Sequence, residues 1–179
     1  MKKLLFLLVF LPSFVFGQNH LSFMGIRLGQ SENAFCQKLK SKGFQYVGVN
    51  NVMHTKMFEG TFWKFQDTRI NVERENGSAT SVLVGLSVKA YNSIDNFTDL
   101  VKGFDKKYGK HHSISVFFKV SEMAGNNGYY WKVNGGYIAT YYDKNPINNE
   151  IMIGIRYMDN TNCRIILENG RRRNTNDDL

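Results

Sequence analysis

Two stretches of this chain resemble each other, and this internal similarity constrains the fold more than any other feature. FWKFQDTRI at Phe62 to Ile70 aligns without a gap with YWKVNGGYI at Tyr130 to Ile138, 68 positions later. A second pair, VLVGLSV at Val82 to Val88 and IMIGIRY at Ile151 to Tyr157, is 69 positions apart. Similarity at a nearly constant spacing predicts two similar supersecondary units in one chain.

A helix is predicted ahead of the strands in each half. Ser31 to Lys42 starts with a favourable N-cap residue, carries Phe35 and Leu39 four positions apart, and is followed by Gly43. Ser93 to Lys107 carries a longer apolar stripe at helical spacing. Each half is therefore predicted to be a helix followed by three or four strands, with hairpin turns at Asn-Gly and Gly-Gly dipeptides.

One such unit is too small to bury the apolar stripe of its own helix well. We therefore predict an α+β fold built as a tandem repeat, with residues 18–90 and 91–167 as the two units of one domain. Both helices are expected to pack on one face of a shared antiparallel sheet. The side chains of the third strands that alternate towards the helices are Val82, Val84, Leu86, Val88, Ile151, Ile153, Ile155 and Tyr157.

The same alternation assigns a face for partner binding. Trp63 and Trp131 are large and apolar, so we assign them to the helix side of the sheet. Their neighbours then point to the side without helices, where aromatic and basic side chains collect, and a tyrosine near a predicted hairpin end joins them. The expected contact residues are Phe62, Lys64, Tyr130, Lys132, Tyr142 and Arg156.

Residues 1–17 have the layout of a secretory signal peptide. Lys2 and Lys3 precede an apolar run of 13 residues, and Gly17 is a small residue at the expected cut before Gln18. The run is shorter than the ~20 residues that a membrane-spanning helix needs, although a membrane anchor is the alternative. We therefore expect an exported, soluble protein, periplasmic or secreted, with no transmembrane segment after signal removal.

The chain is basic, with 23 Lys and Arg against 15 Asp and Glu and a formal net charge of +8. Loss of Lys2 and Lys3 with the signal peptide would leave about +6. In an exported chain this charge favours an anionic envelope polymer or lipid headgroup over nucleic acid, or it is simply a solvated basic surface. Residues 168–179, ENGRRRNTNDDL, contain almost no apolar residue and are expected to be disordered.

Two cysteines remain after processing, Cys36 and Cys163. An exported compartment permits a disulfide between them, which would close a loop of more than a hundred residues and contribute ~4–5 kcal/mol on the chain-entropy model. Two buried thiols that never meet are the alternative, because sequence spacing cannot place two Cα atoms within bonding range.

Three short motifs along the chain are the opening FMGIRLGQSENAFCQKLKSKGF, the strand EGTFWKF and a second helix that ends KKYGK. With these motifs the chain resembles a group of small exported proteins of Gram-negative bacteria of unassigned function. The closing motif is Tyr157, Asp159 and Asn162, and His111 stands where the family usually has proline. The resemblance implies a layout similar to the β-lactamase-inhibitor-protein fold, in which an exposed sheet face binds another protein. It implies no catalytic residues.

No constellation for catalysis or metal binding stands out in the sequence. His111 and His112 have no Cys, His or Asp at metal-ligand spacing, and neither a Gly-x-Ser-x-Gly motif nor a phosphate-binding glycine loop occurs. We therefore expect no metal and no cofactor, and a non-catalytic binding module whose open sheet face docks a protein or an anionic envelope polymer. The alternatives are an envelope hydrolase with carboxylates from both repeats and a structural envelope component.

Overall fold

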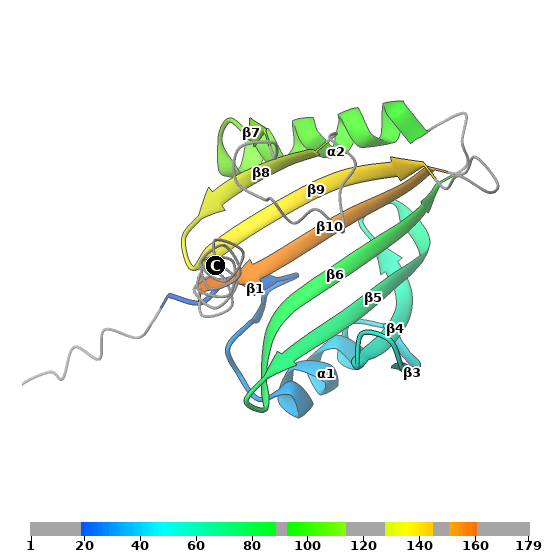
Figure 1. Cartoon of the computed structure of the whole chain (residues 1–179), viewed down its shortest axis with the longest axis vertical. Helices are drawn as coiled ribbons and strands as arrows, with labels where there is room; N and C mark the ends of the chain where they lie inside the picture. Colours follow the sequence, from blue (N-terminus) through cyan, green and yellow to red (C-terminus); the bar gives the residue numbers. More distant parts are fainter. Residues whose placement is uncertain (1–18, 89–92, 114–127, 145–150, 161–179) are drawn as a thin grey trace, which may run out of the picture.

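The computed structural model describes residues 19–88, 93–113, 128–144 and 151–160 (Figure 1). The expected signal peptide at 1–17 and the expected tail at 168–179 lie outside these residues. The described chain contains two helices, an eight-stranded antiparallel sheet and a separate two-stranded sheet. The predicted α+β class is therefore confirmed.

The elements in chain order are β1 (Ser22–Phe23), β2 (Ile26–Arg27), α1 (Glu32–Ser41), β3 (Gln45–Asn50), β4 (Thr55–Phe62), β5 (Phe65–Glu75), β6 (Ser78–Val88), α2 (Ser93–Tyr108), β7 (His112–Ser113), β8 (Gly128–Val133), β9 (Gly136–Lys144) and β10 (Ile151–Asp159). The large sheet has the strand order β3-β4-β5-β6-β10-β9-β8-β7. Its central neighbours are β6 and β10, with Gly85 directly opposite Gly154. Figure 1 shows α1 beside the half of the sheet with β3 to β6, and α2 beside the half with β7 to β10.

Both helices form where the sequence predicts them. The hydroxyl of Ser31 caps α1 by accepting a hydrogen bond from the backbone N–H of Ala34 at 3.3 Å. The helix ends before Gly43, whose φ of 92° is a left-handed conformation that glycine adopts without steric cost. Phe35 and Leu39 are fully buried, so the i,i+4 spacing read from the sequence does mark the packed face of α1.

One hydrophobic core lies between the helices and the sheet. The inward side chains expected from the two central strands are buried in it, namely Val82, Val84, Leu86, Ile153, Ile155 and Tyr157, whereas the side chains of Val88 and Ile151 lie outside the described part. The hairpin β1–β2 adds Phe23, which the sequence analysis did not assign. Its ring stacks on Phe62 at 5.7 Å and meets Tyr157 edge-on at 5.0 Å. Phe23 therefore joins aromatic side chains from both halves of the sheet in one core.

The assignment of Trp63 to the helix side of the sheet is wrong. Trp63 lies in the two-residue turn between β4 and β5, where Phe62 pairs directly with Phe65. It has a φ of 54° and is 55% exposed. In the second half the turn comes later, at residues 134–135, so Trp131 stays inside β8 and is buried as expected. The two tryptophan motifs align without a gap, but the turns of the two hairpins align only after a further shift of three residues. The two tryptophans therefore do not occupy equivalent positions in the two hairpins.

The start of the described chain is held against the end of β10. Asp159 is fully buried, and its carboxylate accepts a hydrogen bond from the backbone N–H of Leu21 at 2.9 Å and lies 2.9 Å from Nδ1 of His20. The backbone of residues 19–21 passes so close to Gly135 that a Cβ at this position would collide with it. A buried carboxylate therefore joins the first and last described segments, in addition to the ring contact of Phe23 with Tyr157.

Asp159→Ala is expected to lower the free energy of unfolding by about 3 kcal/mol, because it leaves a buried N–H without its acceptor and opens a small cavity. Urea unfolding followed by circular dichroism measures the loss. Asp99→Ala is the control, since Asp99 is exposed and its ion pair with Lys64 should contribute less than ~1 kcal/mol. Equal losses for the two variants would contradict the structural role of Asp159.

Candidate functional site

The six side chains expected on one contact face lie in different environments. Phe62 is 7% exposed and belongs to the main core, so its assignment to the open face is wrong. The cause is the early turn, which makes Phe62 the last inward side chain of β4. Lys64 lies in that turn and reaches α2, where its Nζ is 3.0 Å from Oδ2 of Asp99. Tyr142 also faces the helix side, with its ring 4.9 Å from that of Phe97.

The other three predicted residues alternate with core residues and lie on the face without helices. Tyr130 is 7% exposed, packs with Ala139 and Met158 in a second apolar cluster, and stacks on the ring of His112 at 5.1 Å. The expectation that Tyr130 is open to a partner is therefore wrong, because neighbouring side chains cover its ring. Lys132 is exposed, as expected.

Arg156 forms a close ion pair on the face without helices. Its Nη2 lies 2.7 and 2.6 Å from the two carboxylate oxygens of Glu73, and its Nε lies 3.4 Å from the hydroxyl of Ser81. The arginine and glutamate side chains are only 20% and 16% exposed, which strengthens a charge-assisted pair. Glu73 is on β5 and Arg156 on β10, so the pair spans β6 and joins the two halves of the sheet. The two residues are 83 positions apart, so no local sequence pattern predicts that they pair.

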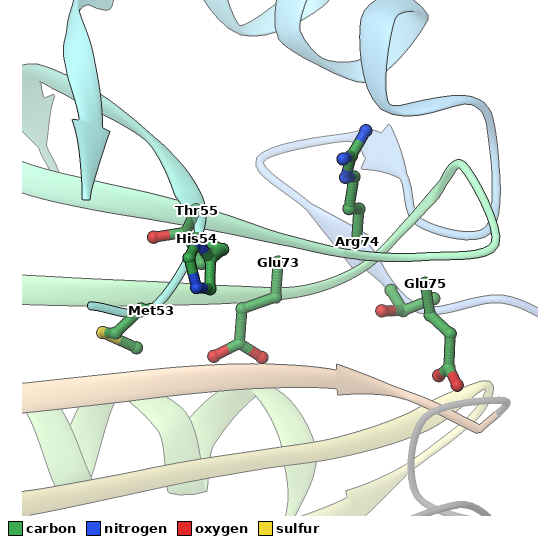
Figure 2. Close-up of a pocket in the computed structure, with 7 residues that line it drawn as sticks. Met53, His54, Thr55, Glu73, Arg74 and Glu75 are labelled. Atoms are coloured by element: carbon green, nitrogen blue, oxygen red, sulfur yellow. The ribbon is translucent and has the colours of Figure 1, made fainter. Parts of the chain in front are cut away.

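A pocket of about 410 Å³ opens beside this ion pair, where the ends of β5 and β6 meet the β3–β4 turn (Figure 2). Its lining residues, called the β5 pocket below, are Met53, His54, Thr55, Glu73, Arg74, Glu75 and Thr80. Figure 2 shows Glu73 and Glu75 leaving β5 on one side with their carboxylates apart, whereas Arg74 points the other way, towards α1. The guanidinium of Arg74 lies 3.7 Å from the carboxylate of Glu32 on α1.

Two carboxylates in one pocket raise the question of acid–base catalysis. Both oxygens of Glu73 are occupied by Arg156, so Glu73 is poorly placed to give or take a proton. Within the described ranges, no group of three or more His, Cys, Asp and Glu side chains could hold a metal ion. The β5 pocket is therefore better arranged for binding than for hydrolysis.

A second polar cluster lies where α2 meets β7 and β8. Oδ1 of Asp105 accepts hydrogen bonds at 3.0 Å from Nε1 of Trp131 and from the backbone N–H of His111, and Nδ1 of His111 is 3.0 Å from both carboxylate oxygens. Burial alone would raise the pKa of the Asp105 carboxyl, but the hydrogen bonds from Trp131 and His111 and the nearby imidazole outweigh it. The pKa of Asp105 therefore lies below its usual value, and the cluster stabilises the packing of α2.

Exposed apolar side chains collect along β3 and the turn that follows it. Tyr46, Val47, Val49 and Val52 are between 45% and 90% exposed. These four residues, called the β3 strip below, lie at one edge of the eight-stranded sheet. The ammonium of Lys40 lies 5.7 Å from the centre of the Tyr46 ring. This surface could not be predicted from the sequence, because a strand pattern does not tell an edge strand from a central one.

Cys36 belongs neither to the lining of the β5 pocket nor to the β3 strip. Cys36 is a buried residue on α1 that forms no disulfide with another described residue, and burial raises the pKa of its thiol. Its expected disulfide partner, Cys163, lies outside the described residues, so the bond stays a prediction.

Removal of the Glu73–Arg156 pair should reveal a coupling energy of about 1–3 kcal/mol in a double-mutant cycle with Glu73→Ala and Arg156→Ala, measured by urea unfolding. Glu59 and Arg69 provide the matched control. They form the same kind of pair at 2.7 Å, but their side chains are 42% and 60% exposed, so their coupling should stay below ~1 kcal/mol. Similar coupling for both pairs would contradict the importance of desolvation at Arg156.

Acid should remove the stability that Asp105 contributes. Because the folded pKa lies below the unfolded value of about 3.9, the contribution is complete above that value and is lost as pH falls through the folded pKa. The difference in unfolding free energy between the parent protein and Asp105→Asn should therefore shrink as the pH is lowered below ~4. Urea unfolding at a series of pH values tests this expectation, and a difference that grows in acid would contradict it.

None of the helices in the described part of the chain is both long and apolar enough to cross a membrane. No protein-family model matches the sequence, and no curated protein and no solved structure matches the chain. The resemblance to small exported proteins and to the β-lactamase-inhibitor-protein fold therefore stays a prediction.

Proposed function

We propose that the protein is a non-catalytic, exported binding module that docks an extended segment of a protein partner along the edge strand β3. The observation that carries this proposal is the β3 strip, in which four large apolar side chains are exposed together. Exposed apolar groups gathered on one strand are typical of interaction surfaces, whereas single ones are ordinary.

The position of β3 in the sheet supports strand addition. β3 is at one end of the strand order, and β7, a strand of two residues, is at the other. Edge strands present unpaired backbone N–H and C=O groups, and natural proteins commonly protect them with lysine or proline. The sequence of β3, QYVGVN, contains neither and carries no charge. A partner strand would therefore gain backbone hydrogen bonds and apolar contacts together.

The register shift in β3 limits how the partner can pair. The shift lies between Tyr46 and Gly48, and Gly48 has a φ of 141°. Such a bulge bends the strand, so regular pairing is restricted to a short segment on either side of Val47. Contacts with the exposed side chains of the β3 strip then supply a large share of the affinity, and backbone hydrogen bonds to β3 supply less.

The charges near β3 indicate the chemistry of the partner. Lys40 and Lys42 are exposed at the end of α1, and Lys40 lies over Tyr46. An extended segment with alternating apolar residues and acidic flanks complements this edge. A purely anionic polymer fits less well, because Lys64 and Arg156 of the originally expected face are already paired with Asp99 and Glu73.

The alternatives are less well supported by the contacts. A hydrolase with carboxylates from both halves would need two available acids in one pocket, and Glu73 in the β5 pocket is held by Arg156. A structural envelope component would remain tightly associated with envelope assemblies. Fractionation of cells that express the full chain separates this alternative from a binding module, which should be released without detergent.

The proposal includes export, with residues 1–17 as the signal peptide, and a tandem origin of residues 18–90 and 91–167. The order of the elements supports the tandem origin, since α1 is followed by β3 to β6 and α2 by β7 to β10. The two sets of four strands run in mirrored order from the centre of the sheet, where Gly85 faces Gly154.

A short peptide of alternating Val and Thr with Glu at both ends tests strand addition. It should bind the protein with an affinity that falls at least ~tenfold when its alternate backbone nitrogens are methylated, because methylation removes the donors that pair with β3. Val49→Lys should weaken binding to the same extent. Fluorescence anisotropy measures the affinities, and the melting temperature of each variant checks its folding.

Met152→Lys is the matched control, because Met152 is also an exposed apolar residue, 57% exposed, but lies on the central strand β10. It should leave peptide binding unchanged. Equal weakening by Met152→Lys and Val49→Lys, or no effect of backbone methylation, would overturn the assignment to β3. Light scattering of the free protein checks whether β3 pairs with a second copy instead, which would also overturn it.

A further inference from the structure

We propose that the β5 pocket binds a primary ammonium group carried on an aliphatic chain. The pocket is separate in chemistry from the β3 strip, because carboxylate, hydroxyl and imidazole groups line it. The inference does not depend on strand addition at β3.

The ion pairs already present around the pocket decide which charged group remains for a ligand. Arg156 compensates Glu73, and the guanidinium of Arg74 points away from Glu73 and Glu75 to Glu32 on α1, which Lys56 also contacts at 3.1 Å. Glu75 makes no ion pair or hydrogen bond with its side chain in the described part of the chain. Glu75 is therefore the carboxylate of the β5 pocket that has no direct counter-charge among the described residues. A cation is the ligand that such a carboxylate favours.

The hydroxyl of Thr80 is a second feature of the pocket that indicates a ligand, and it is independent of the acidic residues. Thr80 is the extra residue of β6 at the point where the β5–β6 register shifts, since Glu73 pairs with Ser81 but Arg74 pairs with Ala79. The residue is 3% exposed, lines the pocket, and has no hydrogen-bond partner within the described residues.

The hydroxyl oxygen of Thr80 is accessible from the pocket. No side-chain oxygen or nitrogen in the described part is fully buried without a partner, so the hydroxyl oxygen is not sealed in the core. The equally buried Thr55, by contrast, donates to Oδ1 of Asn71 at 3.2 Å. A buried hydroxyl that opens into a pocket without a protein partner is a site for a ligand donor, because buried polar groups are normally satisfied.

The lining selects an alkylammonium among cations. An ammonium group has three N–H donors, and the carboxylate of Glu75 and the hydroxyl of Thr80 are both acceptors. The imidazole of His54, which makes no hydrogen bond or ion pair with another described residue, offers a further acceptor on its unprotonated ring nitrogen. The side chain of Met53 provides an apolar wall for the methylene groups. A metal ion is disfavoured, because no group of three ligating side chains is present in the described ranges.

Three probes of similar length and different charge test the inference on the full, 15N-labelled chain. 1,4-Diaminobutane should give saturable NMR shifts of the backbone amides of Glu75 and Thr80, whereas 1,4-butanediol and succinate should give none. Equal shifts with the uncharged diol would overturn the proposal, because binding would then not depend on the ammonium group. Nα-acetyl-lysine amide separates the two sources of such a group: affinity equal to that of the diamine assigns a lysine side chain of a protein, and at least tenfold weaker affinity assigns a free amine.

Two variants test the carboxylate of Glu75 and the hydroxyl of Thr80 separately. Glu75→Gln removes the charge and Thr80→Val removes the hydroxyl at constant shape, and each should weaken 1,4-diaminobutane binding at least ~tenfold. Glu59→Gln is the matched control, since Glu59 is a carboxylate on β4 that pairs with Arg69 outside the pocket. Equal weakening by Glu59→Gln would overturn the proposal, because the effect would then come from the overall charge. Val49→Lys should leave diamine binding unchanged, which keeps this test distinct from that of β3.

Discussion

The structure depends on the antiparallel pairing of β6 with β10. These strands come from the two halves of the chain, and their inward side chains supply the middle of the core that α1, α2 and the β1–β2 hairpin cover. Without this pairing each half would be a small sheet with one face too exposed to water to be stable. On the other face, the ring of Tyr141 lies against Gly154 so closely that a Cβ there would collide with it. A glycine at the centre of the sheet thus allows a side chain of β9 to lie flat across β10.

The sequence was sufficient to predict the elements whose signals are local. The cap at Ser31 and the i,i+4 pair of Phe35 and Leu39 predicted α1, and the alternation of Val82, Val84 and Leu86 predicted the inward face of β6. These predictions succeeded because each depends on periodicity within one element. The α+β class followed from them.

The candidate site could not be predicted in the same way. The residues FWKF and YWKV look equivalent, but the first spans a turn and the second stays in a strand. Only the pairing of Phe62 with Phe65 reveals this difference, and it reverses the face assigned to Phe62. The Glu73–Arg156 pair and the exposure of β3 likewise depend on which strands are neighbours, which is a property of the whole sheet. Lys64 and Arg156, which looked available in the sequence, proved to be paired with Asp99 and Glu73, and so the proposed binding surface is the edge of the sheet and not its face.

The contact of Asp159 with His20 and Leu21 has a consequence for how the chain reaches its native state during synthesis. The partners are 138 and 139 positions apart. His20 and Leu21 leave the ribosome early and cannot make this contact until Asp159 has been synthesised. Contacts of such long range slow folding, and this one cannot form on a nascent chain that stops before β10. The growing polypeptide therefore stays incompletely folded until β10 has emerged. A loose form of this kind is what the export proposed above would require.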